Sequence, residues 1–195
     1  MRQVLCMWSL AVVTVTSGAT RAQAQTVAVG PYYAVPSWDQ QMPCATASNC
    51  QRFVVLTNWI DSTYQSGGAA VLDRETGMVW ERSPSATETD YVHALLACSV
   101  SRVGGRLGWR LPTVYEITSL VDPTVNFPNP NLPPGHPFSN VAAGGFFWTV
   151  SQVTSGSVWV LNLAITTDLL TGDTSNPNQL VRHWCVRGGQ GAGAQ

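Results

Sequence analysis

The cysteines are the residues of this sequence whose chemistry depends most on where the protein works. Four of the five lie beyond the extreme N-terminus: Cys44, Cys50, Cys98 and Cys185. An even number of cysteines in an exported domain is typical of disulfide bonds, although four cysteines allow three pairings. Proximity favours Cys44 with Cys50, which leaves Cys98 with Cys185. The longer bridge would stabilise the fold by roughly 4 to 5 kcal/mol in the chain-entropy model.

Metal sites are the rival interpretation of some of these residues. His183 and Cys185 have strand spacing and could share a zinc ion, but no close cysteine or histidine pair elsewhere completes a tetrahedral set. Asn129-Pro130-Asn131 is similar to the Glu-Pro-Asn type of calcium motif. Calcium prefers carboxylates among its oxygen ligands, and no acidic residue lies between Asp122 and Asp168. We therefore expect no metal and no cofactor.

Five side chains are candidates for contact with a ligand. Arg102 and Arg106 flank a glycine pair and could face sulfate or carboxylate groups, with ordinary solvated arginines as the alternative. Trp38 and Trp59 lie in irregular segments, where a sugar ring could stack on an exposed indole. His136 lies in a proline-rich segment and is the histidine that we expect to be most exposed.

A second group of residues is expected to be structural. It consists of Trp109, Arg110, Pro112, Thr113 and Glu116. Thr113 and Glu116 have the spacing of a capping box at the start of a helix. Arg110 could contact an anionic ligand, but an ion pair with Glu116 or another buried acid is the favoured interpretation.

No catalytic residues are predicted. The chain has no lysine, so it lacks an ammonium group for acid–base or Schiff-base chemistry. It also has no Gly-x-Ser-x-Gly nucleophile elbow. One exposed histidine does not make a mechanism.

The N-terminal residues predict export. Arg2, the apolar run Val4–Val15 and the small residues of Ala22-Gln23-Ala24 have the order of a cleaved signal peptide at 1–24. No apolar run is long enough to span a bilayer after cleavage. Loss of Arg2 and Arg21 would take the formal charge from −1 to −3, which argues against nucleic-acid binding. We expect a periplasmic, extracellular or cell-surface location in a bacterium.

The rest of the chain predicts an α+β domain after an irregular lead-in at 25–69. The first expected elements are a strand at 52–56 and a hairpin with strands at 70–72 and 78–80 around a turn at 73–77. Helices are expected at about 86–101 and from 114 to about 122, followed by a long irregular loop at 123–145. The chain should end with strands at 146–151, 158–165 and 180–187 and a disordered tail at 190–195. Ser85 and Glu88 form the expected cap of the first helix. Four tryptophans with strand spacing are expected in the core: Trp80, Trp148, Trp159 and Trp184.

Several motifs, in the order in which they occur, resemble the Lcl C-terminal domain family. They are Leu72-Asp73-Arg74-Glu75-Thr76-Gly77-Met78-Val79-Trp80, a helix with one cysteine, Gly108-Trp109-Arg110-Leu111-Pro112-Thr113 before Glu116 and Leu120-Val121-Asp122, Phe147-Trp148-Thr149, Trp159, and Cys185-Val186-Arg187-Gly188. The resemblance assigns residues 70–189 to this domain. It implies a C-type-lectin-like fold, with two helices packed on a twisted antiparallel sheet, and a bridge between Cys98 and Cys185.

The resemblance also bears on function. An adhesin member of the family implies binding of sulfated polysaccharides, but this chain lacks the collagen-like repeat of that adhesin, and one scaffold hosts many functions. We expect an exported module that binds a carbohydrate, such as a cell-surface polysaccharide, or another surface ligand without catalysis. A structural or protein-interaction domain of the cell envelope is the alternative, and a hydrolase is the least favoured. The sequence does not determine the oligomeric state.

Overall fold

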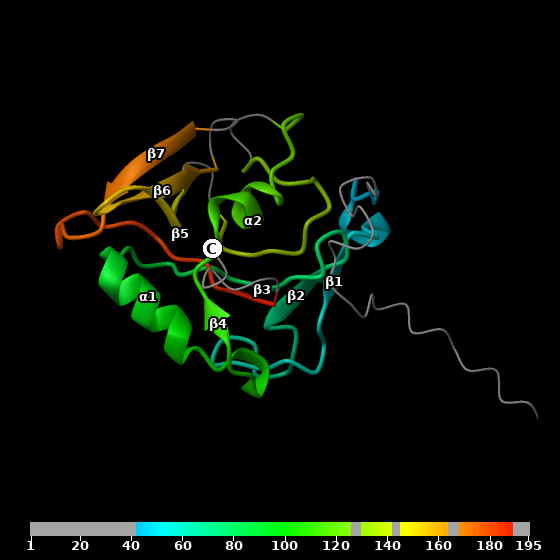
Figure 1. The fold of residues 1–195 in the computed structure, drawn as a ribbon. Helices are drawn as coiled ribbons and strands as arrows, with labels where there is room; N and C mark the ends of the chain where they lie inside the picture. Colours follow the sequence, from blue (N-terminus) through cyan, green and yellow to red (C-terminus); the bar gives the residue numbers. More distant parts are fainter. Residues whose placement is uncertain (1–41, 126–129, 142–144, 164–167, 189–195) are drawn as a thin grey trace, which may run out of the picture.

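A computed structural model of the chain describes residues 42–125, 130–141, 145–163 and 168–188 (Figure 1). The predicted signal peptide at 1–24, Trp38 and the tail at 190–195 lie outside these residues. In the described part of the lead-in, a 3₁₀ helix at Ala47–Asn49 precedes strand β1 at Phe53–Val55. The predicted strand near 52–56 is therefore confirmed.

The described residues form two antiparallel sheets rather than the single sheet that the resemblance implies. In the larger sheet the order is β1, β2 (Ala70–Asp73), β3 (Val79–Glu81), β8 (Val186–Arg187) and β4 (Trp109–Arg110); the smaller sheet consists of β5 (Phe146–Thr154), β6 (Ser157–Asn162) and β7 (Asp168–Asp173). An isolated parallel bridge pairs Phe147 of β5 with Arg182 in the segment before β8. The α+β class is confirmed.

The hairpin between β2 and β3 is formed by its turn residues. The backbone N–H of Gly77 donates to the Asp73 carbonyl at 2.7 Å, and Gly77 has a φ of 69°, which glycine adopts without steric cost. The hydroxyl of Thr76 donates to the Asp73 carboxylate at 3.0 Å. The predicted turn at 73–77 is confirmed.

Two α-helices occur in the described residues, and the first differs from its prediction. Helix α1 spans Tyr91–Val100, and its N-cap is Asp90, whose carboxylate accepts from the His93 N–H at 2.9 Å. The predicted cap of Ser85 and Glu88 is wrong, because the Ser85 hydroxyl instead donates to the Thr87 carbonyl at 2.8 Å.

Helix α2 spans Val114–Thr118 and has the predicted capping box of Thr113 and Glu116. It ends before the predicted Asp122, because the following N–H groups of Leu120 and Val121 bond to carbonyls only three residues back.

The C-terminal strands also differ in part from the prediction. Of the predicted strand at 180–187, only Val186–Arg187 is a regular strand, while Val181 forms an isolated bridge with Thr89. Strand β7 was not among the expected elements. It pairs along the whole of β6, from Ser157 opposite Asp173 to Asn162 opposite Asp168.

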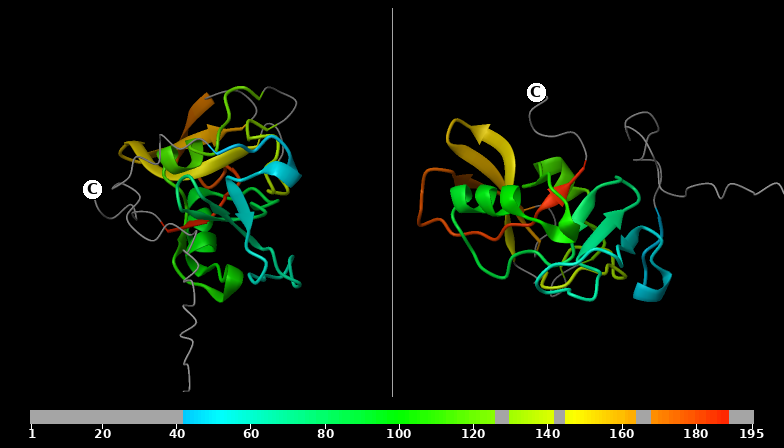
Figure 2. Two further views of the ribbon diagram at one scale, coloured as in Figure 1. Left: turned by 90° about the vertical axis from the view of Figure 1, so that its right-hand side faces the viewer. Right: turned by 90° about the horizontal axis from the view of Figure 1, so that it is seen from below.

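Two clusters of buried side chains form the core, and β5 contributes to both. Phe147 packs in the first cluster with Trp80 and Trp184, and its neighbour Trp148 packs in the second with Cys98. Successive side chains of a strand point to opposite faces, so this sheet is buried on both sides. In Figure 1 and the right-hand view of Figure 2, the two sheets lie on opposite sides of α2. Trp159 is only partly buried, so its predicted core position is wrong.

The described part of the long loop, 123–125, 130–141 and 145, contains no helix or strand, as predicted. It is nevertheless packed against the core. Leu132 and Phe138 are 1% and 6% exposed, and Phe138 makes edge-on contacts with Phe53 and Trp184. These aromatic contacts fix the loop to the first cluster.

Candidate functional site

A cavity of about 420 Å³ collects polar side chains from four separate segments of the chain. We call it the polar cavity; its lining residues are Asp61, Ser62, Glu81, Ser83, Ser85, Arg102, Val103 and His183. Asp61 and Ser62 follow β1, Glu81 ends β3, Arg102 follows α1, and His183 precedes β8. All but Val103 carry a hydrogen-bonding side chain.

Asp61 is held in place by the backbone that follows it. Its Oδ1 accepts from the N–H groups of Thr63 and Tyr64, at 2.7 and 2.6 Å. Such a turn is a local property of aspartate, whose short side chain reaches the backbone two or three residues ahead. Oδ2 makes no hydrogen bond to any described residue, so the carboxylate keeps acceptor capacity for a ligand.

Glu81 is the unusual acid of the cavity. Burial raises its pKa from 4.5 to about 7, although hydrogen bonds from Ser101 and from the Cys185 backbone oppose the shift, and the charge of Asp61 adds to it. The Ser101 hydroxyl donates to Oε1 of Glu81 at 2.8 Å. Glu81 therefore exchanges its proton near neutral pH, which is a property common at functional sites.

His183 adds an imidazole to the same cavity. Burial lowers its pKa, because the charged form loses hydration, so the ring is neutral at neutral pH. Its Nδ1 is buried and has no hydrogen-bond partner among the described residues. The backbone carbonyl of His183 accepts from the Ser85 N–H at 3.0 Å, which joins two walls of the cavity.

Of the two predicted arginines, only Arg102 lines the polar cavity. Its side chain is exposed, and Nη1 donates to the carbonyls of Val100 and Ser101 at 3.0 and 3.2 Å. These carbonyls lie at the C-terminal end of α1, where a cation interacts favourably with the helix dipole.

Arg106 and Trp59 contact each other next to this region. The Arg106 guanidinium carbon lies 5.9 Å from the centre of the Trp59 ring, and Trp109 packs edge-on against the same ring at 6.2 Å. Gly104 lies so close that an added Cβ would be 2.3 Å from a ring atom. Trp59 is therefore packed into the loop rather than presented as an open platform.

His136 lies apart from these residues. It is partly buried and stacks on Phe138 with ring centres 5.9 Å apart, and burial lowers its pKa. The prediction that it is the most exposed histidine is wrong, because the side chain of His93 on α1 is 70% exposed. Arg102, Arg106 and Trp59 thus lie near one another, whereas His136 does not line the polar cavity.

The predicted structural residues form one network around the start of α2. Arg110 donates twice to Glu116, at 2.8 and 2.7 Å, and Glu116 also accepts from the Thr113 N–H. Trp109 is 3% exposed. The Pro112 carbonyl accepts from the Val150 N–H on β5 at 2.9 Å. The ion pair of Arg110 with Glu116 is confirmed.

Both expected disulfides are present. They join Cys44 to Cys50 and Cys98 to Cys185. The zinc interpretation is wrong for Cys185, because its sulfur is bonded to Cys98. Among the described residues, no group of three or more His, Cys, Asp or Glu side chains is placed to hold a metal ion.

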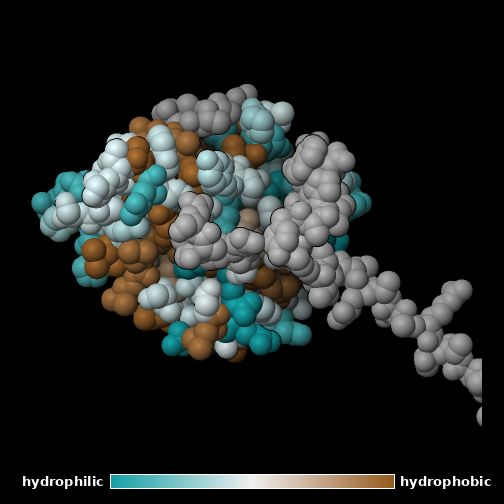
Figure 3. Space-filling view, viewed as in Figure 1, coloured by the Kyte–Doolittle hydropathy of each residue, from teal (hydrophilic) through white to brown (hydrophobic). Residues whose placement is uncertain are grey.

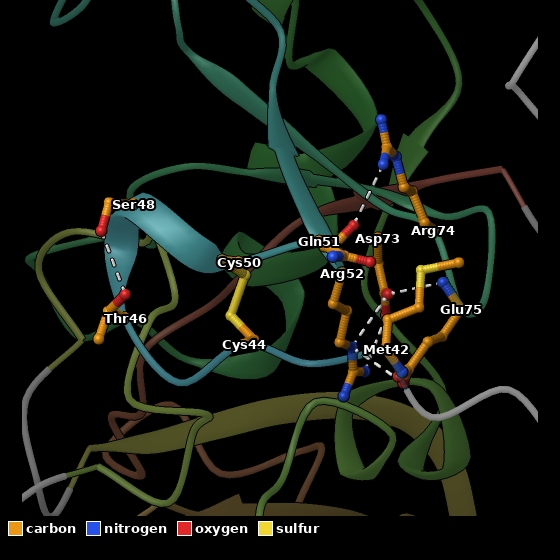
Figure 4. Close-up of a disulfide and its surroundings, with 10 residues drawn as sticks. All are labelled: Met42, Cys44, Thr46, Ser48, Cys50, Gln51, Arg52, Asp73, Arg74 and Glu75. Atoms are coloured by element: carbon orange, nitrogen blue, oxygen red, sulfur yellow. Dashed lines mark hydrogen bonds and ion pairs between the residues drawn. A yellow bond between two sulfur atoms is a disulfide. The ribbon is translucent and has the colours of Figure 1, made fainter.

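A second cavity, of about 490 Å³, lies beside the Cys44–Cys50 bridge. Figure 4 shows two of its charged lining residues, Arg52 and Glu75; Arg52 lies 2.9 Å from the carboxylate of the neighbouring Asp73 and 3.1 Å from that of Glu75. The remaining oxygen of Glu75 accepts from the Met42 N–H at 2.6 Å. Because Arg52 is paired with both carboxylates, its guanidinium is not free to bind a ligand in this cavity.

Sequence reasoning missed the polar cavity as a group. Asp61, Glu81 and His183 are far apart in the chain, and no motif joins them. The available signal was Glu81 itself, an acid directly after the apolar strand residues Val79 and Trp80.

The sequence matches the model of the Lcl C-terminal domain over residues 69–187. The chain therefore belongs to the Lcl C-terminal domain family. No curated protein and no solved structure matched the chain. Within the residues that the structure describes, no helix is long and apolar enough to cross a membrane.

Proposed function

We propose that the chain is an exported module that binds a carbohydrate in the polar cavity without chemical turnover. The observation that carries this proposal is the cavity lining, in which three serine hydroxyls, two carboxyl groups, an imidazole and a guanidinium share about 420 Å³. Sugar hydroxyls both donate and accept hydrogen bonds, so a mixed set of donors and acceptors suits them. The volume lies in the range of ~300 to 1,000 Å³ typical of small-ligand pockets.

Export and the lectin-like fold are parts of the same proposal. Two disulfides are typical of proteins in oxidising compartments, and the N-terminal residues have the pattern of a signal peptide. Two helices packed with antiparallel sheets are compatible with a C-type-lectin-like arrangement.

The cysteines of the described residues offer no nucleophile for turnover. The four cysteines of the described residues are bonded in pairs, so none of them supplies a thiolate. Asp61 and Glu81 are two carboxyl groups in different environments, which is also what a glycoside hydrolase requires. The size of a bound oligosaccharide after incubation separates the two functions, because only hydrolysis shortens it.

Protein interaction is the second candidate, and the surface of α1 favours it. Val92, Leu96 and Val100 are 62%, 57% and 55% exposed, and Leu180 next to the helix start is 52% exposed. Figure 3 shows hydrophobic surface gathered over α1. Contiguous exposed apolar side chains on a folded domain are typical of an interaction surface.

The test uses the mature chain, residues 25–195, on a glycan array and on a heparin-type column. We expect glycan binding that weakens when Ser83 and Ser85 are both changed to Ala. If anionic groups of the glycan contribute, the double variant Arg102→Ala with Arg106→Ala should lose salt-sensitive retention on the heparin-type column. Arg74 is exposed and lies away from the cavity, so Arg74→Ala is the control. Failure to bind any glycan at low salt would contradict the proposal and favour protein contacts.

A further inference from the structure

We infer that the polar cavity binds a primary ammonium group carried on a sugar ring, so that the ligand is an amino sugar. The inference rests on the proposed function and names the class of carbohydrate. Its basis is the placement of Asp61 and Glu81 in one cavity, with the hydroxyls of Ser83 and Ser85 and a neutral imidazole beside them.

The charges of the lining residues favour a cation. Asp61 and Glu81 are acids, and the charge of Asp61 contributes to the raised pKa of Glu81. His183 does not balance them, because burial keeps its ring neutral. Arg102 is the one cation among the lining residues, and it is exposed and hydrogen-bonded to carbonyls at the end of α1. A ligand cation between the two carboxylates would therefore stabilise both in their charged forms.

The hydrogen-bonding groups also fit an ammonium group, which has three donors and no acceptor. Oδ2 of Asp61 is free of hydrogen bonds to the described residues, and the carboxylate of Glu81 is held toward the segment after α1 by Ser101. The hydroxyls of Ser83 and Ser85 each donate to a backbone carbonyl, at 3.4 and 2.8 Å. The Ser85 oxygen also accepts from the Thr87 N–H at 3.2 Å, so the Ser83 oxygen is the freer acceptor for the hydroxyl donors of a sugar.

The same charges disfavour sulfated or carboxylated sugars inside the cavity. An anionic substituent next to Asp61 and Glu81 would be repelled by Asp61 and by the charged form of Glu81, and such repulsion adds to selectivity alongside attraction. Arg106 does not line the cavity and is engaged with Trp59. The polar cavity thus separates cationic from anionic sugars by charge.

The test is calorimetric titration of the mature chain at pH 7 with three tetrasaccharides: a glucosamine tetramer, its fully N-acetylated form and neutral cellotetraose. We expect the glucosamine tetramer to bind at least about tenfold more tightly than the others, since a charge-assisted hydrogen bond is lost in both. Glu81→Gln and Asp61→Asn should each weaken its binding about tenfold. Asp173→Asn is the matched control, because Asp173 caps a turn in the same way and does not line the cavity.

A pH series adds a readout that a structural role would not change. After correction for the protonation of the ligand's own amino groups, binding should weaken as the pH falls from 7 to 6, because Glu81 gains its proton, and Glu81→Gln should remove this residual dependence. Burial lowers the pKa of His183, so its protonation is disfavoured over this range, and His183→Gln provides a check on its contribution. Unfolding curves test whether both variants fold, and Asp61→Asn, at a partly buried position, provides a second variant if Glu81→Gln does not fold.

Three outcomes would overturn the inference in different ways. Equal binding of all three tetrasaccharides would refute the ammonium site and leave carbohydrate binding intact. Binding of none would refute the proposed function itself. If lysine amide binds as tightly as the glucosamine tetramer, the cavity recognises an amine of a protein rather than an amino sugar.

Discussion

The hydroxyl of Ser101 donates a 2.8 Å hydrogen bond to Oε1 of Glu81, and so joins the segment after α1 to the end of β3. The bond stabilises the charged form of a carboxyl group that burial disfavours. Ser101 therefore sets how far the pKa of Glu81 can rise.

Removal of this hydroxyl should raise the pKa of Glu81 above its value of about 7, because the charged form loses a donor. The measurement is an NMR titration of the Glu81 side-chain carbonyl in Ser101→Ala. Ser99→Ala, which removes a hydroxyl bonded within α1, serves as the control. An unchanged or lower pKa in Ser101→Ala would contradict the assignment.

The contribution of Glu81 to stability should fall as the pH rises through neutrality, because Glu81 binds its proton more tightly in the folded state than in the unfolded state. Its contribution is complete below 4.5 and is lost as the pH passes about 7. The loss is at most about 3 kcal/mol. Urea unfolding of wild type and Glu81→Gln at pH 5 and pH 8 isolates it as the difference between the two proteins, because the lowered pKa values of His136 and His183 act in the opposite direction in both. If the free energy of unfolding changes equally between pH 5 and pH 8 in wild type and in Glu81→Gln, Glu81 is not the source of the change.

Gly104 and Gly105 form a matched pair for testing the packing of Trp59. Both have a φ near +65°, so alanine costs about 1 to 2 kcal/mol at either position. Only at Gly104 would the new Cβ approach the Trp59 ring, at 2.3 Å, whereas nothing lies within 4 Å at Gly105. Gly104→Ala should therefore be less stable than Gly105→Ala by a further ~1 to 3 kcal/mol in denaturant unfolding. Equal stabilities would mean that Trp59 is not packed there.

Glu116 should contribute more to stability than an acid at the surface, because it both caps α2 and pairs with Arg110. Glu116→Ala removes both interactions and should cost about 2 to 3 kcal/mol in thermal or denaturant unfolding. Glu116→Gln retains an acceptor and should cost less. Exposed Glu88, the wrongly predicted cap, is the control, and Glu88→Ala should change stability by less than about 0.5 kcal/mol. Similar costs at both positions would argue against the network.

The two disulfides should contribute unequally. They close loops with sequence separations of 6 and 87 residues, and the chain-entropy model gives the longer loop roughly 2 kcal/mol more stabilisation. Cys98 and Cys185 are also 0% and 1% exposed. The paired variants Cys98→Ala with Cys185→Ala and Cys44→Ala with Cys50→Ala, compared in denaturant, measure the difference. A larger loss from the short bridge would refute this ranking.

The sequence was most informative where the interaction is local. Thr113 and Glu116 are three residues apart, so their capping box can be read directly, and Asp73 to Gly77 contain the residues that their turn requires. Cys44 and Cys50 are close enough along the chain to indicate their bond.

Predictions were wrong where tertiary contacts decide between local options. Ser85 and Asp90 are both good helix caps, and the bridge of Thr89 to Val181 keeps the chain extended up to Asp90. Strand β7 has polar residues, and its pairing with β6 determines its structure. The polar cavity depends on four segments that only the fold brings together, and no local pattern encodes it.

The bond between Cys98 and Cys185 encloses the whole of α2, the long loop and the smaller sheet within one covalent ring. A protease that cuts the chain once inside this ring opens it without releasing a fragment. The nicked protein would keep its mass on a non-reducing gel and separate into two pieces only after reduction. Accidental cleavage of the loop at 123–145 therefore leaves Glu81 and His183, on opposite sides of the cut, attached to the same molecule.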